Sequence, residues 1–219
     1  MTHLKVELFD RLDDEHPGAT LEDSNPETDK RQLFWDLHHV DADIDFADKA
    51  RRVRVERGGE YRRGDHVILL DEVRQSDTRA VSIDPDVEAD VDLNLVGFAD
   101  KAAAAKIVLN PNEDGAFRLR IQLFDEVNRR VPHLVLYDWQ FPPEEGPADL
   151  NTFHFADRAA FVIIDRGSAF VEGDTVVLQD KVGGGSKELR ISLEEPMTEV
   201  DLNTKNFADK AAALRFELT

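Results

Sequence analysis

Short stretches in which apolar and polar residues alternate recur along the whole chain. In the last of them Leu214, Phe216 and Leu218 fall on one side, and Arg215 and Glu217 fall on the other. A period of two places apolar side chains on one face of an extended strand. Similar patterns occupy residues 5–8, 67–69, 120–123, 176–178 and 189–193. The chain is therefore predicted to be all-β.

A pentad of the form Phe-Ala-Asp-Lys/Arg-Ala interrupts these strand-like stretches four times. Its aspartates are Asp48, Asp100, Asp157 and Asp209, and 109 residues separate the first from the third and the second from the fourth. Such spacing indicates a unit that was doubled, and a pair that was doubled again. Strand-like residues follow each pentad, so we interpret each one as a loop that ends just before a strand.

The repeats predict the architecture. Each offers about four short strands, and two such repeats make a Greek-key sandwich of antiparallel strands. The expected fold is two tandem sandwich domains, residues 1–111 and 112–219, joined near the Pro- and Gly-containing segment 110–116. Residues 11–32 are polar and carry two prolines, and we expect them to form an exposed, mobile loop.

The charge limits the partners. The chain has 46 acidic and 27 basic residues, a formal net charge of −19. Such a surface repels phosphate backbones and anionic membranes, so no nucleic-acid or membrane partner is expected. Cations or a basic protein remain open as partners. Solubility in a high-salt habitat explains the acidity equally well.

Several features bear on compartment and chemistry. There is no cysteine, and neither a signal peptide nor a run of about 18 apolar residues is visible, so a cytoplasmic protein is expected unless a leader was trimmed. The Gly-rich stretch 182–188 lacks the spacing of a phosphate loop, and no Gly-x-Ser-x-Gly elbow occurs. We expect no enzyme.

Three smaller patterns have two interpretations each. Alternating acids at residues 84–92 and 41–45 suggest either a cation-attracting face or a solvated edge that discourages aggregation. His38 and His39 suggest metal ligands, but neighbours on a strand point to opposite faces, which favours surface histidines. Trp35, Tyr137 and Trp139 suggest a sugar-binding face or, in their strand-like context, core residues.

The repeat pattern and its loops resemble the βγ-crystallin superfamily. The segments "DLNLVGFADKAAAAKIV" and "DLNTKNFADKAAALRF" follow the layout of that family's closing loop. The resemblance implies four Greek-key motifs and loops that bind calcium through backbone and side-chain oxygens. The family's hydroxyl ligands are missing, because their positions hold other residues: Arg51-Arg52, Ala103-Ala104, Ala160-Phe161 and Ala212-Ala213. The calcium loops are therefore interpreted as degenerate.

The retained aspartates allow two roles. Asp48, Asp100, Asp157 and Asp209 either stabilise the turns by accepting backbone hydrogen bonds or form weak calcium sites. The first hypothesis is a non-enzymatic βγ-crystallin-like structural or interaction protein. The alternatives are a weak calcium-binding protein stabilised by the ion, and a carbohydrate- or protein-recognition module that uses exposed loops such as residues 11–32.

Overall fold

The computed structural model describes residues 2–23, 32–40, 45–73, 79–127, 131–142, 146–183 and 185–219. These residues form antiparallel strands and short 3-10 turns, so the protein is all-β, as the alternating pattern predicts. Within these ranges, none of the helices has the length and apolar character that a bilayer crossing requires.

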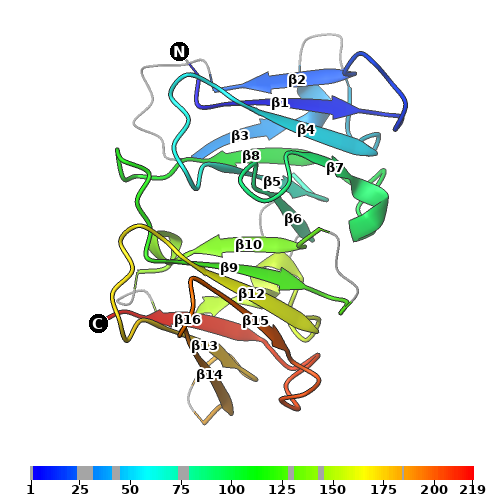
Figure 1. Ribbon diagram of the computed structural model, residues 1–219. Coiled ribbons are helices and arrows are strands. Elements are labelled where there is room, and N and C mark those ends of the chain that lie inside the picture. The colour runs from blue at the N-terminus through cyan, green and yellow to red at the C-terminus, as the bar shows by residue number, and fades with distance from the viewer. Residues whose placement is uncertain are drawn as a thin grey trace. The chain divides into compact units, whose positions relative to one another are not determined.

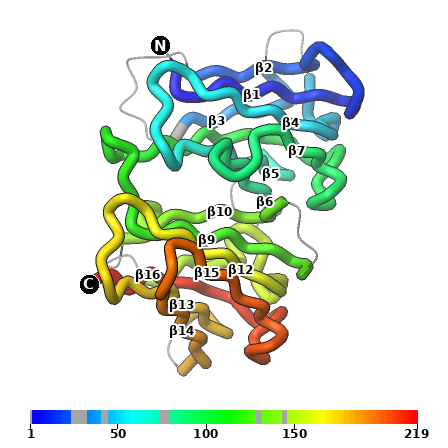
Figure 2. Tube along the Cα trace, viewed as in Figure 1, coloured from blue at the N-terminus to red at the C-terminus, as the bar shows by residue number. Residues whose placement is uncertain are grey.

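The chain divides into two compact units, Met1–Gly115 and Ala116–Thr219. Figures 1 and 2 show the first unit in blue to green and the second in green to red. The division predicted from the sequence, between residues 111 and 112, lies in the same connecting segment.

Unit 1 contains two four-stranded antiparallel sheets, with strand orders β2-β1-β4-β7 and β3-β8-β5-β6. Its strands are β1 (Leu4–Phe9), β2 (Ala19–Glu22), β3 (Gln32–Asp36), β4 (Arg52–Arg57), β5 (His66–Leu70), β6 (Ala80–Ile83), β7 (Asp90–Asp92) and β8 (Ala104–Val108). Apolar side chains from both sheets are fully buried, among them Val6, Val53, Leu69 and Ile107.

Unit 2 repeats this arrangement, with orders β10-β9-β12-β15 and β11-β16-β13-β14. Its strands are β9 (Leu119–Phe124), β10 (Leu134–Tyr137), β11 (Ala148–Asp149), β12 (Phe161–Arg166), β13 (Thr175–Gln179), β14 (Glu188–Ser192), β15 (Met197–Asp201) and β16 (Ala213–Glu217). Two such sheets per unit are the components of a β-sandwich.

The two repeats of a unit exchange one strand each. The third strand of the first repeat, β3, pairs with β8 of the second, and the third strand of the second repeat, β7, pairs with β4 of the first. In unit 2, β11 and β15 do the same. The sequence predicted four strands per repeat, but hydrophobic alternation does not specify which neighbour a strand pairs with.

The segment 11–32 differs from the expected loop. Residues 19–22 form β2, which pairs with β1 so that Leu21 lies opposite Val6. Ala19 and Leu21 are buried while Thr20 and Glu22 are exposed, a strand alternation hidden within an acidic context. Residues 24–31 lie outside the described part of the chain.

The acidic run 84–92 is not one extended strand, so its alternating acids do not line one face. Asp84 is 2% exposed, and its Oδ1 accepts a hydrogen bond from the backbone N–H of Asp86 at 2.8 Å, within a turn. Only Asp90–Asp92 form a strand, β7. The turn interrupts the alternation because the Asp84 carboxylate satisfies the backbone locally. In the other run, Asp41 and Asp43 lie outside the described residues.

Candidate functional site

The four pentads are loops that end just before β4, β8, β12 and β16, as predicted. Their aspartates all adopt the left-handed backbone conformation: φ is 55° at Asp48, 56° at Asp100, 56° at Asp157 and 52° at Asp209. Side chains larger than Gly rarely adopt this conformation, and Asp and Asn tolerate it best. The shared left-handed backbone conformation therefore explains why all four pentads have Asp at this position.

The backbone at each aspartate joins two repeats of one unit. Each aspartate N–H donates to the carbonyl of the last pentad Ala in the partner repeat, and the partner returns the same bond. The four bonds run from Asp48 to Ala102 at 2.9 Å, Asp100 to Ala50 at 2.9 Å, Asp157 to Ala211 at 2.9 Å and Asp209 to Ala159 at 3.0 Å. Each unit therefore carries a reciprocal loop pair, here called the paired corner loops.

The other pentad residues also have structural contacts. The phenylalanines are at most 6% exposed and the last alanines are fully buried: Phe46, Phe98, Phe155, Phe207, Ala50, Ala102, Ala159 and Ala211. The base at the fourth position donates to the carbonyl four residues earlier: Lys49 to Asp45 at 2.5 Å, Lys101 to Gly97 at 2.5 Å, Arg158 to His154 at 3.4 Å and Lys210 to Asn206 at 2.7 Å. The base is thus a cap for a loop carbonyl.

A second short motif, Asp-Leu-Asn, supplies the turn-stabilising carboxylate. The side chains of Asp92, Asp149 and Asp201 accept the backbone N–H two residues later at 2.8–2.9 Å. A 3-10 turn follows Asp92 and Asp149, and a hydrogen-bonded turn follows Asp201. The leucine carbonyl of this motif then accepts the N–H of the pentad Phe, as from Phe98 to Leu93 at 2.8 Å. The aspartate side chain that stabilises a turn by accepting a backbone N–H is therefore that of the Asp-Leu-Asn motif, whereas the sequence had suggested the pentad aspartate for this role.

Sequence reasoning missed the first copy of this motif because it reads Asp36-Leu37-His38. His38 N–H donates to Asp36 Oδ1 at 2.9 Å, and Phe46 N–H donates to the Leu37 carbonyl at 2.7 Å. His38 Nδ1 lies 3.6 Å from an oxygen of Asp45. His38 thus occupies the place of the motif's asparagine in an exposed turn, and alignment of the four repeats contained the signal.

The pentad carboxylates are the parts of these loops that could contribute oxygen ligands to a cation. All four are exposed, and Asp100 pairs with Arg51 at 2.8 Å. Within the described ranges, the side chains of Asp48, Asp157 and Asp209 have no hydrogen bond or ion pair. The same ranges contain no group of three or more His, Asp or Glu arranged to hold a metal ion. A cation at these loops would need backbone carbonyls and water as further ligands.

Each unit also has a fully buried carboxylate, Asp65 in unit 1 and Asp174 in unit 2, that the sequence patterns did not single out. In unit 2, Asp174 accepts the backbone N–H of Val171 and of Thr219, each at 3.0 Å, and forms a two-nitrogen ion pair with Arg118, whose Nε lies 2.8 Å away. The carboxylate therefore ties together a hairpin, the first strand region and the last residue of the unit. The Arg118 contact and these backbone donors outweigh burial and hold the Asp174 pKa below its ordinary value.

Unit 1 has the same arrangement with a different base. Asp65 accepts the N–H of Arg62 at 2.7 Å and of Asn110 at 2.6 Å, and its Oδ2 lies 2.9 Å from His3 Nδ1. Burial is the largest effect here and raises the Asp65 pKa above its ordinary value. Asp65 and Asp174 are 109 residues apart, so they occupy equivalent positions in the two units. Their pKa values are nevertheless shifted in opposite directions.

The three aromatic residues considered as a sugar-binding face, Trp35, Tyr137 and Trp139, do not all belong to the same unit. Tyr137 is fully buried and stacks on Trp139 with ring centroids 5.8 Å apart, in a cluster with Phe117 and Val135. Trp35 belongs to unit 1 and is half-buried. Within unit 2 these aromatic side chains pack against one another, as expected for core residues.

Comparisons of the chain with protein-family models, with curated proteins and with solved structures found no match. The functional argument therefore depends on the residues and geometry described above.

Proposed function

We propose that this chain is a non-enzymatic structural or interaction protein of βγ-crystallin-like, Greek-key architecture, with degenerate calcium loops. The observation that carries the proposal is the reciprocal hydrogen bonding of the paired corner loops. Phe, Ala and the basic residue of each pentad are engaged in packing or capping, and the aspartate N–H is engaged in joining repeats. These contacts support a bracing role for the loops.

The strand exchange supports the same proposal. A repeat whose third strand lies in its partner's sheet cannot complete either sheet alone. The two repeats of a unit are thus expected to fold together, which suits a rigid module that presents its surface to a partner.

The experiment is thermal unfolding in chelator, in millimolar calcium and in equal magnesium. The brace proposal expects calcium and magnesium to raise the midpoint equally, because both only screen the net charge of −19. A variant with Asn at Asp48, Asp157 and Asp209 keeps the left-handed backbone and is expected to show the same ion response. A calcium-specific rise that the Asn variant loses would contradict a purely structural role.

A weak calcium site is the second candidate. It is favoured by the exposed carboxylates of Asp48, Asp157 and Asp209, which lack protein partners in the described ranges while their backbones are ordered by the corner pairing. Calcium prefers six to eight oxygen ligands, so one carboxylate per loop predicts low affinity. Calorimetric titration separates the candidates, since stabilisation by mass action appears only well above the dissociation constant.

A further inference from the structure

The turn between β14 and β15 gathers acidic side chains where the two sheets of unit 2 are connected. Each of these strands lies at the edge of its sheet, and residues 193–196 join them. Residues 192–199 contain three acids and no base. A cavity of about 290 Å³ lies at this turn, lined by Ser192, Glu194, Glu195, Met197, Thr198 and Glu199.

This surface is formed by described residues. In unit 2, the stretches outside the description are 128–130, 143–145 and residue 184. The first connects β9 to β10 and the second precedes β11, and both β10 and β11 are at the opposite edges of the two sheets. Residue 184 precedes β14, whereas the cavity begins at Ser192, the last residue of that strand.

Unit 1 has an acidic turn at the equivalent place, and arginines of the same chain neutralise it. Arg57 Nη2 donates to the Pro85 carbonyl at 2.7 Å and also lies 2.7 Å from Asp86 Oδ1. Arg63 Nε lies 3.8 Å from Asp86 Oδ2. One carboxylate is thus held between two guanidinium groups, one from the end of β4 and one from the connection that follows it.

A shared hydrogen bond shows which residues of the two turns correspond. Arg166 follows Arg57 by 109 residues, and its Nη2 donates to the Leu193 carbonyl at 2.5 Å as Arg57 donates to Pro85. Leu193 therefore takes the place of Pro85. The next residue, Glu194, takes the place of the paired aspartate of unit 1.

Glu194 lacks the partners that its counterpart has. The Arg166 guanidinium stacks on the Phe170 ring, 4.3 Å from the ring centroid. The second arginine of unit 1 is replaced, 109 residues later, by an acid, Glu172. Among the residues that the structure describes, neither Glu194 nor Glu195 has a side-chain hydrogen bond or ion pair, and both are exposed. Two carboxylates of this turn can therefore take a cationic group from outside the chain.

The neighbouring strand has lost its bases as well. In unit 1, Asp90 of β7 pairs with Arg52 at 2.6 Å and with Arg54, directly opposite in the sheet, at 3.2 Å. In unit 2, Glu199 of β15 lies opposite Ile163, the equivalent of Arg54. The guanidinium groups that β4 supplies in unit 1 are thus replaced by apolar side chains on β12.

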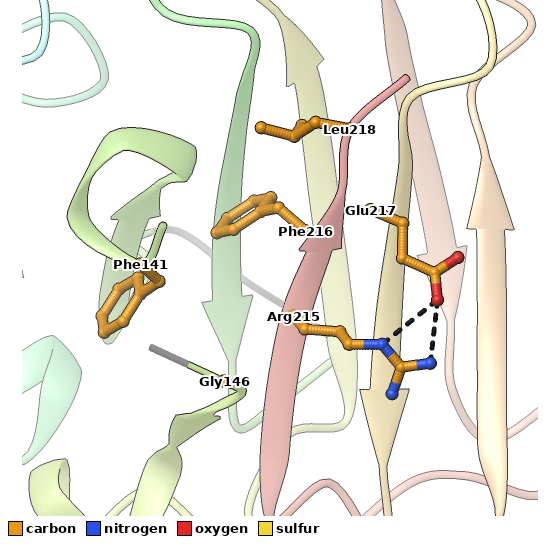
Figure 3. A pocket seen from close by; sticks show the side chains of 6 residues that line it. All are labelled: Phe141, Gly146, Arg215, Phe216, Glu217 and Leu218. Carbon is orange, nitrogen blue, oxygen red and sulfur yellow. Dashed lines mark hydrogen bonds and ion pairs between the residues drawn. The ribbon is translucent and has the colours of Figure 1, made fainter. Parts of the chain in front are cut away.

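Other acids of unit 2 have partners within the chain. Figure 3 shows the Arg215 guanidinium beside the Glu217 carboxylate of β16, 2.8 Å apart. Arg215 also lies 2.9 Å from Glu188 of β14, and Arg190 of that strand lies 3.1 Å from the same glutamate. The unpaired carboxylates are thus a local property of the turn that follows β14.

We propose that this acidic turn binds an arginine side chain from an extended segment of a partner protein, in the place that the Arg57 and Arg63 guanidinium groups have in unit 1. A guanidinium is a planar fork of N–H donors that matches carboxylate oxygens, so arginine fits neighbouring glutamates better than lysine does. Met197, which is 50% exposed, offers apolar surface to the aliphatic part of the arginine. The inference rests on the interaction role proposed above and names the partner chemistry for it.

The test uses the full chain and a synthetic peptide, acetyl-Arg-Val-Arg-Val-Glu-Arg-amide, which copies residues 52–57. An NMR titration is expected to shift the backbone amides of Glu194 and Glu195. The amides of Asp86 and Asp90, whose carboxylates are already paired, are the internal reference and are expected to stay unchanged. The same peptide with lysine in place of each arginine carries equal charge and is expected to bind about threefold more weakly.

Three chain variants that change the net charge equally separate the turn from general attraction. Glu194→Gln/Glu195→Gln removes both carboxylates and is expected to weaken peptide binding about tenfold, through the loss of two exposed ion pairs. Glu172→Arg restores a base that unit 1 has and is expected to weaken binding by a similar factor. Asp157→Asn/Asp209→Asn, in exposed loops of the same unit, is expected to leave the affinity within about twofold.

Four results would overturn the proposal. They are the absence of shifts in the turn at millimolar peptide, equal binding of the lysine peptide, parent-like binding by Glu172→Arg, and an equal loss in the asparagine and glutamine variants. The last result would show attraction by net charge alone. None of them touches the bracing role of the paired corner loops, which the comparison of calcium with magnesium tests separately.

Discussion

The backbone N–H of Asp157 donates to the carbonyl of Ala211 at 2.9 Å, while Asp209 returns the equivalent bond to Ala159 at 3.0 Å. The two aspartates are 52 residues apart in sequence yet hold the same left-handed conformation. A repeated pentad thus forms a symmetric joint between repeats. Most of the joint is made by backbone, which suggests how its side chains should respond to mutation.

Substitution of Asp157 separates backbone from side-chain roles. Asp157→Ala places a Cβ-bearing residue without a polar side chain at φ of 56° and should lower the free energy of unfolding by about 1 kcal/mol. Asp157→Gly removes the steric penalty and should cost markedly less. Urea unfolding in chelator, followed by Trp139 fluorescence in a Trp35→Phe background, measures both. Equal losses for Gly and Ala would show that the carboxylate itself stabilises the loop.

The Asp-Leu-Asn turns should depend on their aspartate side chains. Asp36 belongs to the first copy of the motif, which reads Asp36-Leu37-His38. Asp36→Ala removes the acceptor for the His38 N–H and should lower the free energy of unfolding by about 1 kcal/mol, as for other lost N-caps. Asp201→Ala should cost a similar amount in unit 2. Asp13→Ala, at an exposed residue paired only with Arg11, is the control and should be near neutral. A neutral Asp36→Ala would contradict the equivalence of the four turns.

The buried pair of Arg118 and Asp174 should matter more than a surface pair. Arg118→Met leaves a fully buried carboxylate without its cation and should destabilise unit 2 by about 3 kcal/mol. Arg215→Met, the same substitution in the exposed network of sheet β11-β16-β13-β14, should cost less than about 1 kcal/mol. Denaturant unfolding compares the two, and similar losses would rule out a special role for Asp174.

Acid should affect the two buried aspartates in opposite directions. The Asp174 pKa is lowered, so its stabilisation is present above the ordinary value of 3.8 and is lost as pH falls below that value. The Asp65 pKa is raised, so its ionisation opposes folding, and stability falls as pH rises from 3.8 through the folded pKa. Denaturant unfolding measured between about pH 2.5 and 6 tests both directions, because this range extends at least about one pH unit to each side of the ordinary Asp pKa of 3.8. In a Trp35→Phe background the remaining Trp139 reports the unfolding of unit 2, and in a Trp139→Phe background Trp35 reports the unfolding of unit 1.

The control for this pH experiment is Asn substitution. Asp174→Asn should flatten the acid-side loss in unit 2, and Asp65→Asn should remove the opposing slope in unit 1. If both variants kept the parent pH profiles, neither buried carboxylate would govern acid stability.

Salt should stabilise the protein. A net charge of −19 produces self-repulsion that monovalent salt screens, so the thermal midpoint should rise between about 0.1 and 1 M potassium chloride, where the Debye length falls from about 10 to 3 Å. Differential scanning calorimetry measures the shift. A falling midpoint would show that exposed ion pairs such as Arg190–Glu217 outweigh the net repulsion.

The sequence by itself determined the all-β class and the loop character of the pentads. Alternation around residues such as Leu214 and Phe216 is a local property, and so is the strand that begins soon after each pentad. The sequence also predicted a division between residues 111 and 112, and the contacts of the chain divide it after Gly115.

Only the tertiary structure decided which strands pair and what each repeated residue does. The exchange of β3 and β7, the left-handed φ of Asp48 and the burial of Asp65 and Asp174 depend on partners far away in the chain. Local pattern sets which face of a segment is apolar, whereas pairing, desolvation and backbone conformation in loops are properties of the assembled contacts.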